Sequence, residues 1–96
     1  MQLEVLTPDK LLYRGEVDYV QMPGINGSFG VLNNHAPLIS ALGKGMVKVD
    51  QVKAGSAYDA FSGEYAETKA QSKVFEFEIN GGVVEVLKNK IIILAE

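Results

Sequence analysis

The glycine-rich segment of residues 24–42 also holds the single histidine of the chain, and both features could support chemistry. Gly24, Gly27 and Gly30 recur at intervals of three residues. Phosphate-binding loops place their glycines as GxxxxGK(S/T) or GxGxxG and lead into a helix whose amino terminus faces the anion. The present spacing matches neither pattern and no long helical pattern follows it, so a nucleotide site is not predicted here.

His35 is a candidate general base, because imidazole gains and loses a proton near neutral pH. A catalytic triad also needs a nucleophile and an orienting acid, and no serine of the chain lies in a GxSxG elbow. A histidine followed by Ala36 and Pro37 is more typical of a loop or an interface. We therefore predict no catalytic residue, and a hydrolase or isomerase that uses His35 stays as an alternative.

Glu76 and Glu78 form a second candidate, because paired carboxylates hydrolyse glycosides and residues two apart on a strand share a face. They alternate with Phe75, Phe77 and Ile79, which is the pattern of a strand with one solvated face. That alternation already explains both glutamates, so we interpret them as solvent-facing residues.

Composition narrows the class of protein. The chain has 96 residues, of which 47% are hydrophobic and 22% charged, as in an ordinary globular protein. Natural domains cluster at about 100–150 residues, so one domain over residues 1–96 is expected. The net charge is −3 and the basic residues are scattered, which argues against a nucleic-acid partner. With no cysteine and one histidine, we expect no metal site. We also expect no cofactor and no direct small-molecule substrate.

The first ten residues have neither the basic start and apolar core of a secretory signal nor the composition of a transit peptide. The longest apolar run, residues 91–95, is far shorter than the roughly 20 residues that span a bilayer. From the residues alone we expect a soluble, cytoplasmic protein.

A period of two dominates the chain and predicts strands. It is clear in Leu3 and Val5 near the start, and a phase slip near Tyr19 predicts a β-bulge. Towards the end, turn signals at residues 80–82 and 88–90 predict a meander of three strands, at 74–80, 83–87 and 90–95. Many short strands between glycine-rich turns indicate a sandwich or a barrel.

Residues 50–73 differ from this pattern. Tyr58, Phe61 and Tyr65 have helical spacing, but Gly55 and Gly63 interrupt it. A helix, a long hairpin and a mobile loop therefore stay open for this segment.

The glycine segment also offers apolar surface to a protein partner. Ile25, Phe29, Val31 and Leu32 would supply contact area on a tightly turned segment, although burial in the domain's own core could account for Phe29 and Leu32.

Three parts of the sequence resemble one family. "PGINGSFGVLNNHAPLISALGKGMVKV", residues 23–49, is similar to G-x-x-G-x-F/L-G-I/V-L-x-x-H-A-P-L followed by G-M-I/V-x-I/V, the pattern of the epsilon subunit of F-type ATP synthases, equivalent to the mitochondrial delta subunit. "FEINGGVVEVLKNKIIILAE", residues 77–96, resembles a second segment of that family, and "LEVLTPDKLLYRGEVDYVQMPG" a third. The resemblance covers residues 1–49 and 77–96.

The resemblance implies a ten-stranded β-sandwich of two sheets that is a non-catalytic rotor subunit of the central stalk. Such a subunit links the gamma subunit to the ring of c subunits and couples proton translocation to ATP synthesis, peripherally, at the cytoplasmic face of the bacterial inner (plasma) membrane. Carried over by position, Gly27, Ser28, Phe29 and Gly30, with His35 nearby, would face the c ring. Ile39 and Met46 would lie toward gamma.

The sequence departs from this family in two ways. The family commonly continues into a carboxyl-terminal helical hairpin that inhibits ATP hydrolysis, and residues 1–96 do not include one, so its regulation is expected to be absent. The connection around residues 50–73 is unusually long. A sandwich adaptor of an unrelated assembly is a further alternative.

Overall fold

The computed structural model describes residues 1–52, 66–67 and 74–96, and the regular elements within them are all strands. In chain order these are β1 (Gln2–Leu6), β2 (Leu11–Gly24), β3 (Gly27–Leu32), β4 (Leu38–Leu42), β5 (Gly45–Gln51), β6 (Ala66–Glu67), β7 (Val74–Ile79), β8 (Gly82–Leu87) and β9 (Lys90–Ala95). The predicted all-β class is confirmed. The described residues form nine strands rather than the ten that the resemblance implies. Most of the connection of residues 50–73 lies outside the described residues. The three alternatives for it, a helix, a long hairpin and a mobile loop, therefore stay predictions.

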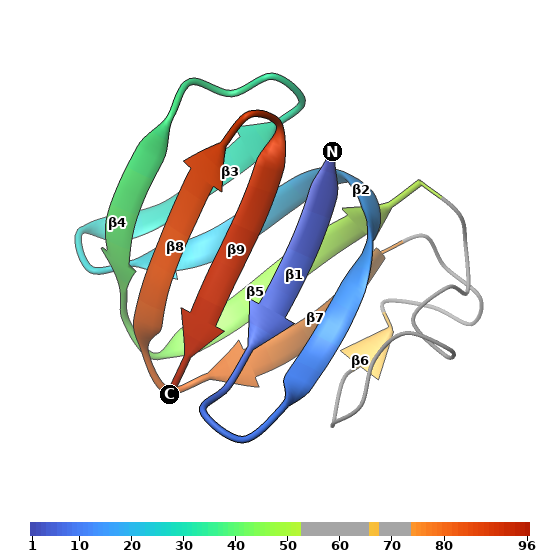
Figure 1. The fold of residues 1–96 in the computed structure, drawn as a ribbon. Coiled ribbons are helices and arrows are strands. Elements are labelled where there is room, and N and C mark those ends of the chain that lie inside the picture. Colours follow the sequence, from blue (N-terminus) through green and yellow to red (C-terminus); the bar gives the residue numbers. More distant parts are fainter. Residues whose placement is uncertain (53–65, 68–73) are drawn as a thin grey trace.

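The strands form two layers packed face to face, as in a β-sandwich (Figure 1). One layer, here called the β8 layer, contains β4, β8, β9, β1 and the first half of β2. The other, the β5 layer, contains β3, the second half of β2, β5, β7 and β6. Hydrogen-bonded neighbours follow the order β1-β9-β8-β4-β2-β5-β7-β6, with β3 attached to β2. Of the two alternatives left by the residues, sandwich and barrel, the sandwich is confirmed.

β2 belongs to both layers. Its first part pairs with β1, ending at Gln2 opposite Glu16, and its second part pairs with β5 from Val17 onward. The register with β5 shifts between Val17 and Tyr19, where the phase slip in the sequence predicted a bulge, so that prediction is confirmed. A bulge bends a strand and increases its twist, which accounts for the passage of β2 from one layer to the other.

The core lies between the layers and takes alternate residues from each strand. In β7, Phe75, Phe77 and Ile79 are buried and Glu78 is exposed, as the alternation predicted. Burial of each such side chain contributes about 1.5–3 kcal/mol. The buried apolar residues of the described part of the chain are Met1, Leu3, Val5, Tyr13, Val17, Val20, Met22, Val31, Leu42, Val47, Val49, Phe75, Phe77, Ile79, Val84, Val86, Ile91, Ile93 and Ala95. They form one contiguous cluster.

Two tight turns join β7, β8 and β9. Gly81 and Gly82 have φ angles of 138° and 150°, and in the second turn Lys88 and Asn89 have φ angles of 51° and 61°. Positive φ at Lys88 and Asn89 suits the right-handed twist of the two-residue hairpin between β8 and β9. The connection at Gly81 is not a hairpin, because it leads from β7 in the β5 layer to β8 in the β8 layer. The two turns and the three strands are confirmed, with bounds within one residue of those expected. The predicted meander is wrong, because β7 pairs with β5 and β6 whereas β8 pairs with β4 and β9, so only β8 and β9 are neighbours. In this described part of the chain no helix has the length and apolar character needed to cross a membrane.

Candidate functional site

The glycine segment forms the hairpin between β2 and β3. Gly24 pairs with Gly27, whose φ of 126° favours glycine, and two residues between them make the turn. A β-carbon on Gly24 would lie 2.6 Å from the Gly27 carbonyl oxygen, and one on Gly30 would overlap the ring of Tyr19. The three glycines therefore serve a tight turn and the packing of an aromatic ring rather than an anion site.

A hollow of about 450 Å³ lies between this hairpin and β4, bordered by residues 24–29 with Ser40 and Ala41. Phe29 is half-buried against the core beside it, whereas Leu32 is 62% exposed. Val31, which the sequence interpretation counted as surface, is fully buried. The expectation for Val31 is wrong because of the strand register: Val31 lies opposite Val20 on the inward face of the β5 layer, and its neighbour Leu32 lies on the outward face.

His35 lies in the loop between β3 and β4, and its side chain is exposed. Its backbone N–H donates to the Leu32 carbonyl oxygen at 3.2 Å, and its Nδ1 is 2.7 Å from the Ala36 carbonyl oxygen. Among the described residues no carboxylate is hydrogen-bonded to His35, and no group of three or more His, Asp or Glu side chains is placed to hold a metal. This surrounding fits a loop histidine better than a general base.

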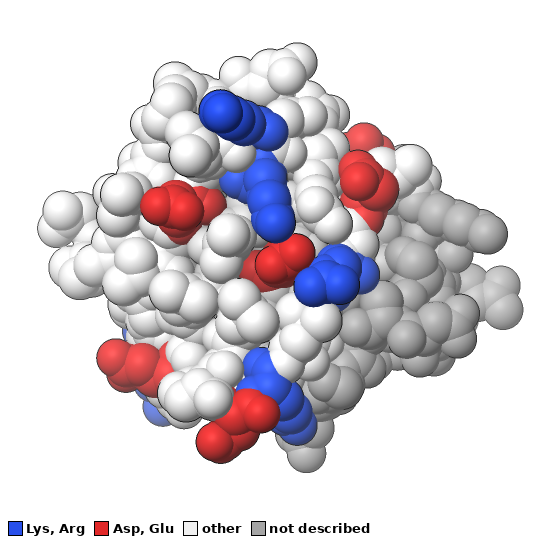
Figure 2. All heavy atoms as spheres, viewed as in Figure 1, with Lys and Arg blue, Asp and Glu red and all other residues white. Residues whose placement is uncertain are grey.

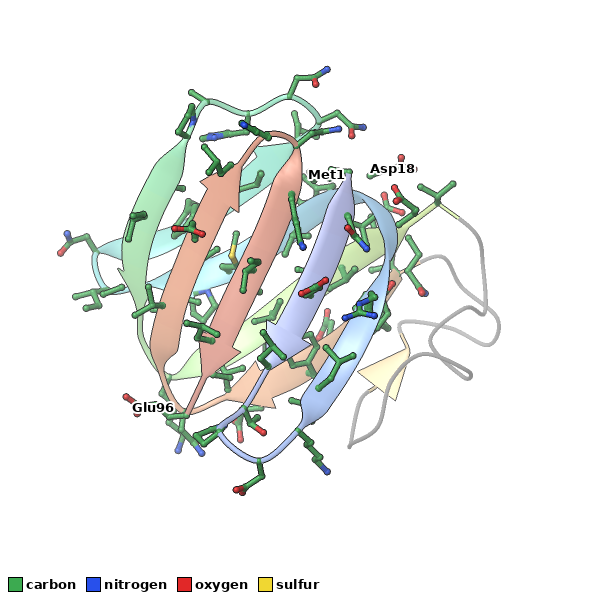
Figure 3. All side chains as sticks on the ribbon, in the orientation of Figure 1. Met1, Asp18 and Glu96 are labelled. Atoms are coloured by element: carbon green, nitrogen blue, oxygen red, sulfur yellow. The ribbon has the colours of Figure 1, made fainter. Side chains whose placement is uncertain are left out.

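Two asparagines attach this loop to neighbouring elements. The Met1 amino group donates to Asn33 Oδ1 at 2.8 Å, and the Asn34 N–H donates to Asn89 Oδ1, in the β8–β9 turn, at 2.8 Å. Met1 lies at the end of the molecule that carries this loop and turn, and Glu96 lies at the opposite end of the β8 layer (Figure 3). The loop that carries His35 is thus held by side-chain hydrogen bonds from two directions.

The hairpin and His35 are not brought together. Gly27 and Ser28 begin β3, and His35 follows its far end. A strand of this length, with six residues, spans roughly 17 Å. The two parts of the expected c-ring contact therefore lie at opposite ends of one strand.

The two residues expected to face gamma lie on different layers. Ile39, on β4, is 72% exposed and pairs with Glu85 of β8. Met46, on β5, is 45% exposed and pairs with Glu78 of β7. Each thus has an exposed glutamate as its cross-strand neighbour, on a separate face of the sandwich.

An apolar surface on the β8 layer was missed from the sequence. We call it the β8 outer face, and its apolar residues are Ile39, Ala41, Val83, Leu87, Ile92 and Leu94. Figure 2, in the orientation of Figure 1, looks onto this layer and shows charged groups separated by broad uncharged areas. The sequence does contain a signal for this surface, because β8 and β9 are near-continuous apolar runs. A strand with one solvent-exposed face would instead alternate apolar and polar residues.

Comparison with known proteins connects this sequence and fold to a family. The family described as "ATP synthase, Delta/Epsilon chain, beta-sandwich domain" matches residues 1–72. The chain is 40% identical over 96 residues to the ATP synthase epsilon chain of Nitratidesulfovibrio vulgaris (strain DP4) and 34% identical to that of Leptospira borgpetersenii serovar Hardjo-bovis (strain JB197). These matches cover 100% of this chain but only 58% and 61% of the relatives, so the chain spans less than two thirds of their length.

Two solved structures have a similar fold. One is a cryo-EM structure of the Tetrahymena thermophila mitochondrial ATP synthase, central stalk and c-ring, with a TM-score of 0.66 and 18% identity, over 99% of this chain and 62% of that chain. The other is a cryo-EM structure of the Euglena gracilis mitochondrial ATP synthase, OSCP/F1/c-ring in rotational state 1. Its TM-score is 0.72 and its sequence identity 19%, over 97% of this chain and 48% of that chain. At these identities the likeness is one of fold. Since the family match covers well over half of the sequence, the chain belongs to the ATP synthase delta/epsilon chain β-sandwich domain family.

Proposed function

We propose that the chain is a non-catalytic rotor subunit of the central stalk of an F-type ATP synthase, linking gamma to the c-subunit ring and coupling proton translocation to ATP synthesis. The family match over residues 1–72 carries this proposal. It is supported by 40% identity to an ATP synthase epsilon chain. The subunit acts by rigid binding and takes no cofactor or substrate of its own. Its place is the cytoplasmic face of the bacterial inner membrane, as a peripheral protein.

For the contact with the c ring we propose Gly27, Ser28, Phe29 and Gly30, together with His35. The exposure of the hairpin and of the His35 loop supports this contact. A ring contact that uses both would extend along β3, over roughly 17 Å.

For the contact with gamma we propose Ile39 and Met46. Both are large apolar residues that the described part of the chain leaves exposed. Because they lie on different layers, gamma would have to reach around the connection between β4 and β5 to touch both.

Size-exclusion chromatography of the chain mixed with the gamma subunit of the same organism tests the function. Co-elution in equal amounts is the expected result. Separate elution, with both proteins folded, contradicts the proposal. The alternative of an adaptor in an unrelated assembly predicts instead that the native chain co-purifies without any ATP synthase subunit.

We further propose that residues 1–96 fold as one domain with the ten strands of the family's sandwich. Nine strands and one contiguous core within the described residues support this. An experimental structure that includes residues 53–65 and 68–73 tests the strand count.

A further inference from the structure

Asparagine is followed directly by glycine at two places in the chain, Asn26 with Gly27 and Asn80 with Gly81. An asparagine in this context can react with its own backbone, because glycine has no β-carbon to keep its nitrogen away from the preceding side chain. Both asparagines are exposed, so access to the side-chain amide does not distinguish them. The two glycines have different surroundings, and the reaction requires the glycine nitrogen to move.

Asn26 and Gly27 lie at the tip of the β2–β3 hairpin, which projects from one side of the sandwich (Figure 1). Gly27 is exposed, and a β-carbon on it would meet no atom within 4 Å beyond its chain neighbours. The pair of Gly24 with Gly27 is the last of its ladder, and the ends of a ladder open most readily. The hollow of about 450 Å³ beside the hairpin also borders Asn26 and leaves it open to water.

The second glycine, Gly81, is enclosed. It is buried, and its carbonyl oxygen accepts the Glu96 N–H at 3.1 Å. A β-carbon on Gly81 would lie 3.3 Å from Glu96 Oε2 and 3.5 Å from the Leu42 carbonyl oxygen. Ile79, directly before Asn80, is part of the core. The Gly81 nitrogen can therefore move only if the connection between the two layers opens.

We propose that Asn26 is a site of spontaneous deamidation and that the fold protects Asn80 from the same reaction. The Gly27 backbone nitrogen attacks Asn26 Cγ and forms a C–N bond. The bond from Cγ to the side-chain nitrogen breaks, and this nitrogen leaves as ammonia with the proton of the Gly27 amide. Water then opens the resulting cyclic imide at either of its carbonyls, which leaves aspartate or isoaspartate in place of Asn26.

The reaction changes both the charge and the backbone of the hairpin. Residues 23–32 contain no ionisable side chain, so the new carboxylate is the first charge of this segment. Isoaspartate also lengthens the backbone by one carbon, directly beside the pair of Gly24 with Gly27 that closes the turn. The expected c-ring contact begins at Gly27, and this part of the inference rests on the proposed function. We expect a deamidated hairpin to bind the ring more weakly, because its turn is altered and its charge has to be desolvated.

Mass spectrometry of the full chain, incubated for weeks at neutral pH, tests the modification. Trypsin places the two asparagines in separate fragments, residues 15–44 and 74–88, and tandem spectra identify the one that has reacted. We expect Asn26 in the folded chain to react within about threefold of its rate in urea, and Asn80 at least about tenfold more slowly than in urea. Asn26→Gln is the matched control, because a glutamine amide has to close a larger ring and reacts far more slowly. If Asn26 stays intact, or if folding slows both sites equally, the inference is wrong.

Binding to the purified c ring tests the consequence separately. Each form of the chain is compared with its own fresh sample. The incubated unchanged chain is expected to bind at least about threefold more weakly, and incubated Asn26→Gln as well as before incubation. If the deamidated chain binds with unaltered affinity, the effect on the ring contact is wrong and the modification site stands. If the fresh chain does not bind the ring, the proposed ring contact fails, and the mass measurement still decides whether Asn26 deamidates.

Discussion

The ring of Tyr19 occupies the space that a β-carbon on Gly30 would need. Gly30 lies opposite Gln21 on β2, and the Tyr19 side chain crosses diagonally to cover it. A glycine at this position is therefore explained by side-chain packing on the outward face of the β5 layer.

Gly30→Ala should lower the free energy of unfolding by about 1–3 kcal/mol, because the added methyl group forces the Tyr19 ring out of its place. Urea denaturation measures the effect. Combining Gly30→Ala with Tyr19→Ala should cost less than the sum of the two single changes. Ser28→Ala, at an exposed position two residues away, is the control and should stay within about 0.5 kcal/mol. An equal effect at Ser28 and Gly30 would show that the packing argument is wrong.

Tyr13→Phe should destabilise the fold by about 1 kcal/mol. The Tyr13 hydroxyl donates to Gln51 Oε1 at 3.2 Å, and both side chains are buried. Tyr19→Phe, at a half-buried tyrosine, serves as the control and should have less effect. Thermal or urea unfolding of the two variants measures the loss of stability. A larger loss of unfolding free energy for Tyr19→Phe than for Tyr13→Phe would contradict the prediction.

Asn89→Gly should loosen the loop that carries His35 and leave the rest of the sandwich intact. Glycine accepts the φ of 61° at this position, so the change removes the bond to the Asn34 N–H without strain. We expect hydrogen exchange of the Asn34 amide to accelerate roughly fivefold, as measured by NMR. Lys88→Gly, at the neighbouring residue with a φ of 51°, is the control. The same acceleration in both variants would indicate a general effect of glycine in the turn.

Ile39→Glu should weaken gamma binding at least about tenfold, because it places a second acid beside Glu85 on the β8 outer face. Met46→Glu, on the β5 layer, should have the smaller effect. Surface plasmon resonance with immobilised gamma compares the two. A stronger loss at Met46 would assign gamma to the β5 layer.

Local features of this fold were predictable from the sequence. The alternation around Phe75 and Phe77, the phase slip at Tyr19 and the turn at Gly81 each depend on residues next to one another in the chain. Periodicity and turn chemistry are short-range effects, so a single sequence contains them.

Relationships between distant strands were not predictable in the same way. The spacing of Ile39 and Met46 in the sequence does not show that the chain changes layers between them, because strand pairing is set by long-range contacts. The β8 outer face was hidden for another reason. Val83 and Val84 are both apolar, and a continuous apolar run does not reveal which of its residues faces the core.

The passage of β2 through both layers has a mechanical consequence. Each layer is bonded to one half of the same strand, through β1 at one end and β5 at the other. Sliding or rotation of one layer over the other therefore has to bend the peptide backbone of β2 or break one of its hydrogen-bonded ladders, in addition to disturbing side-chain packing. In a subunit held by one partner on each layer, twisting load would pass between them along this covalent chain.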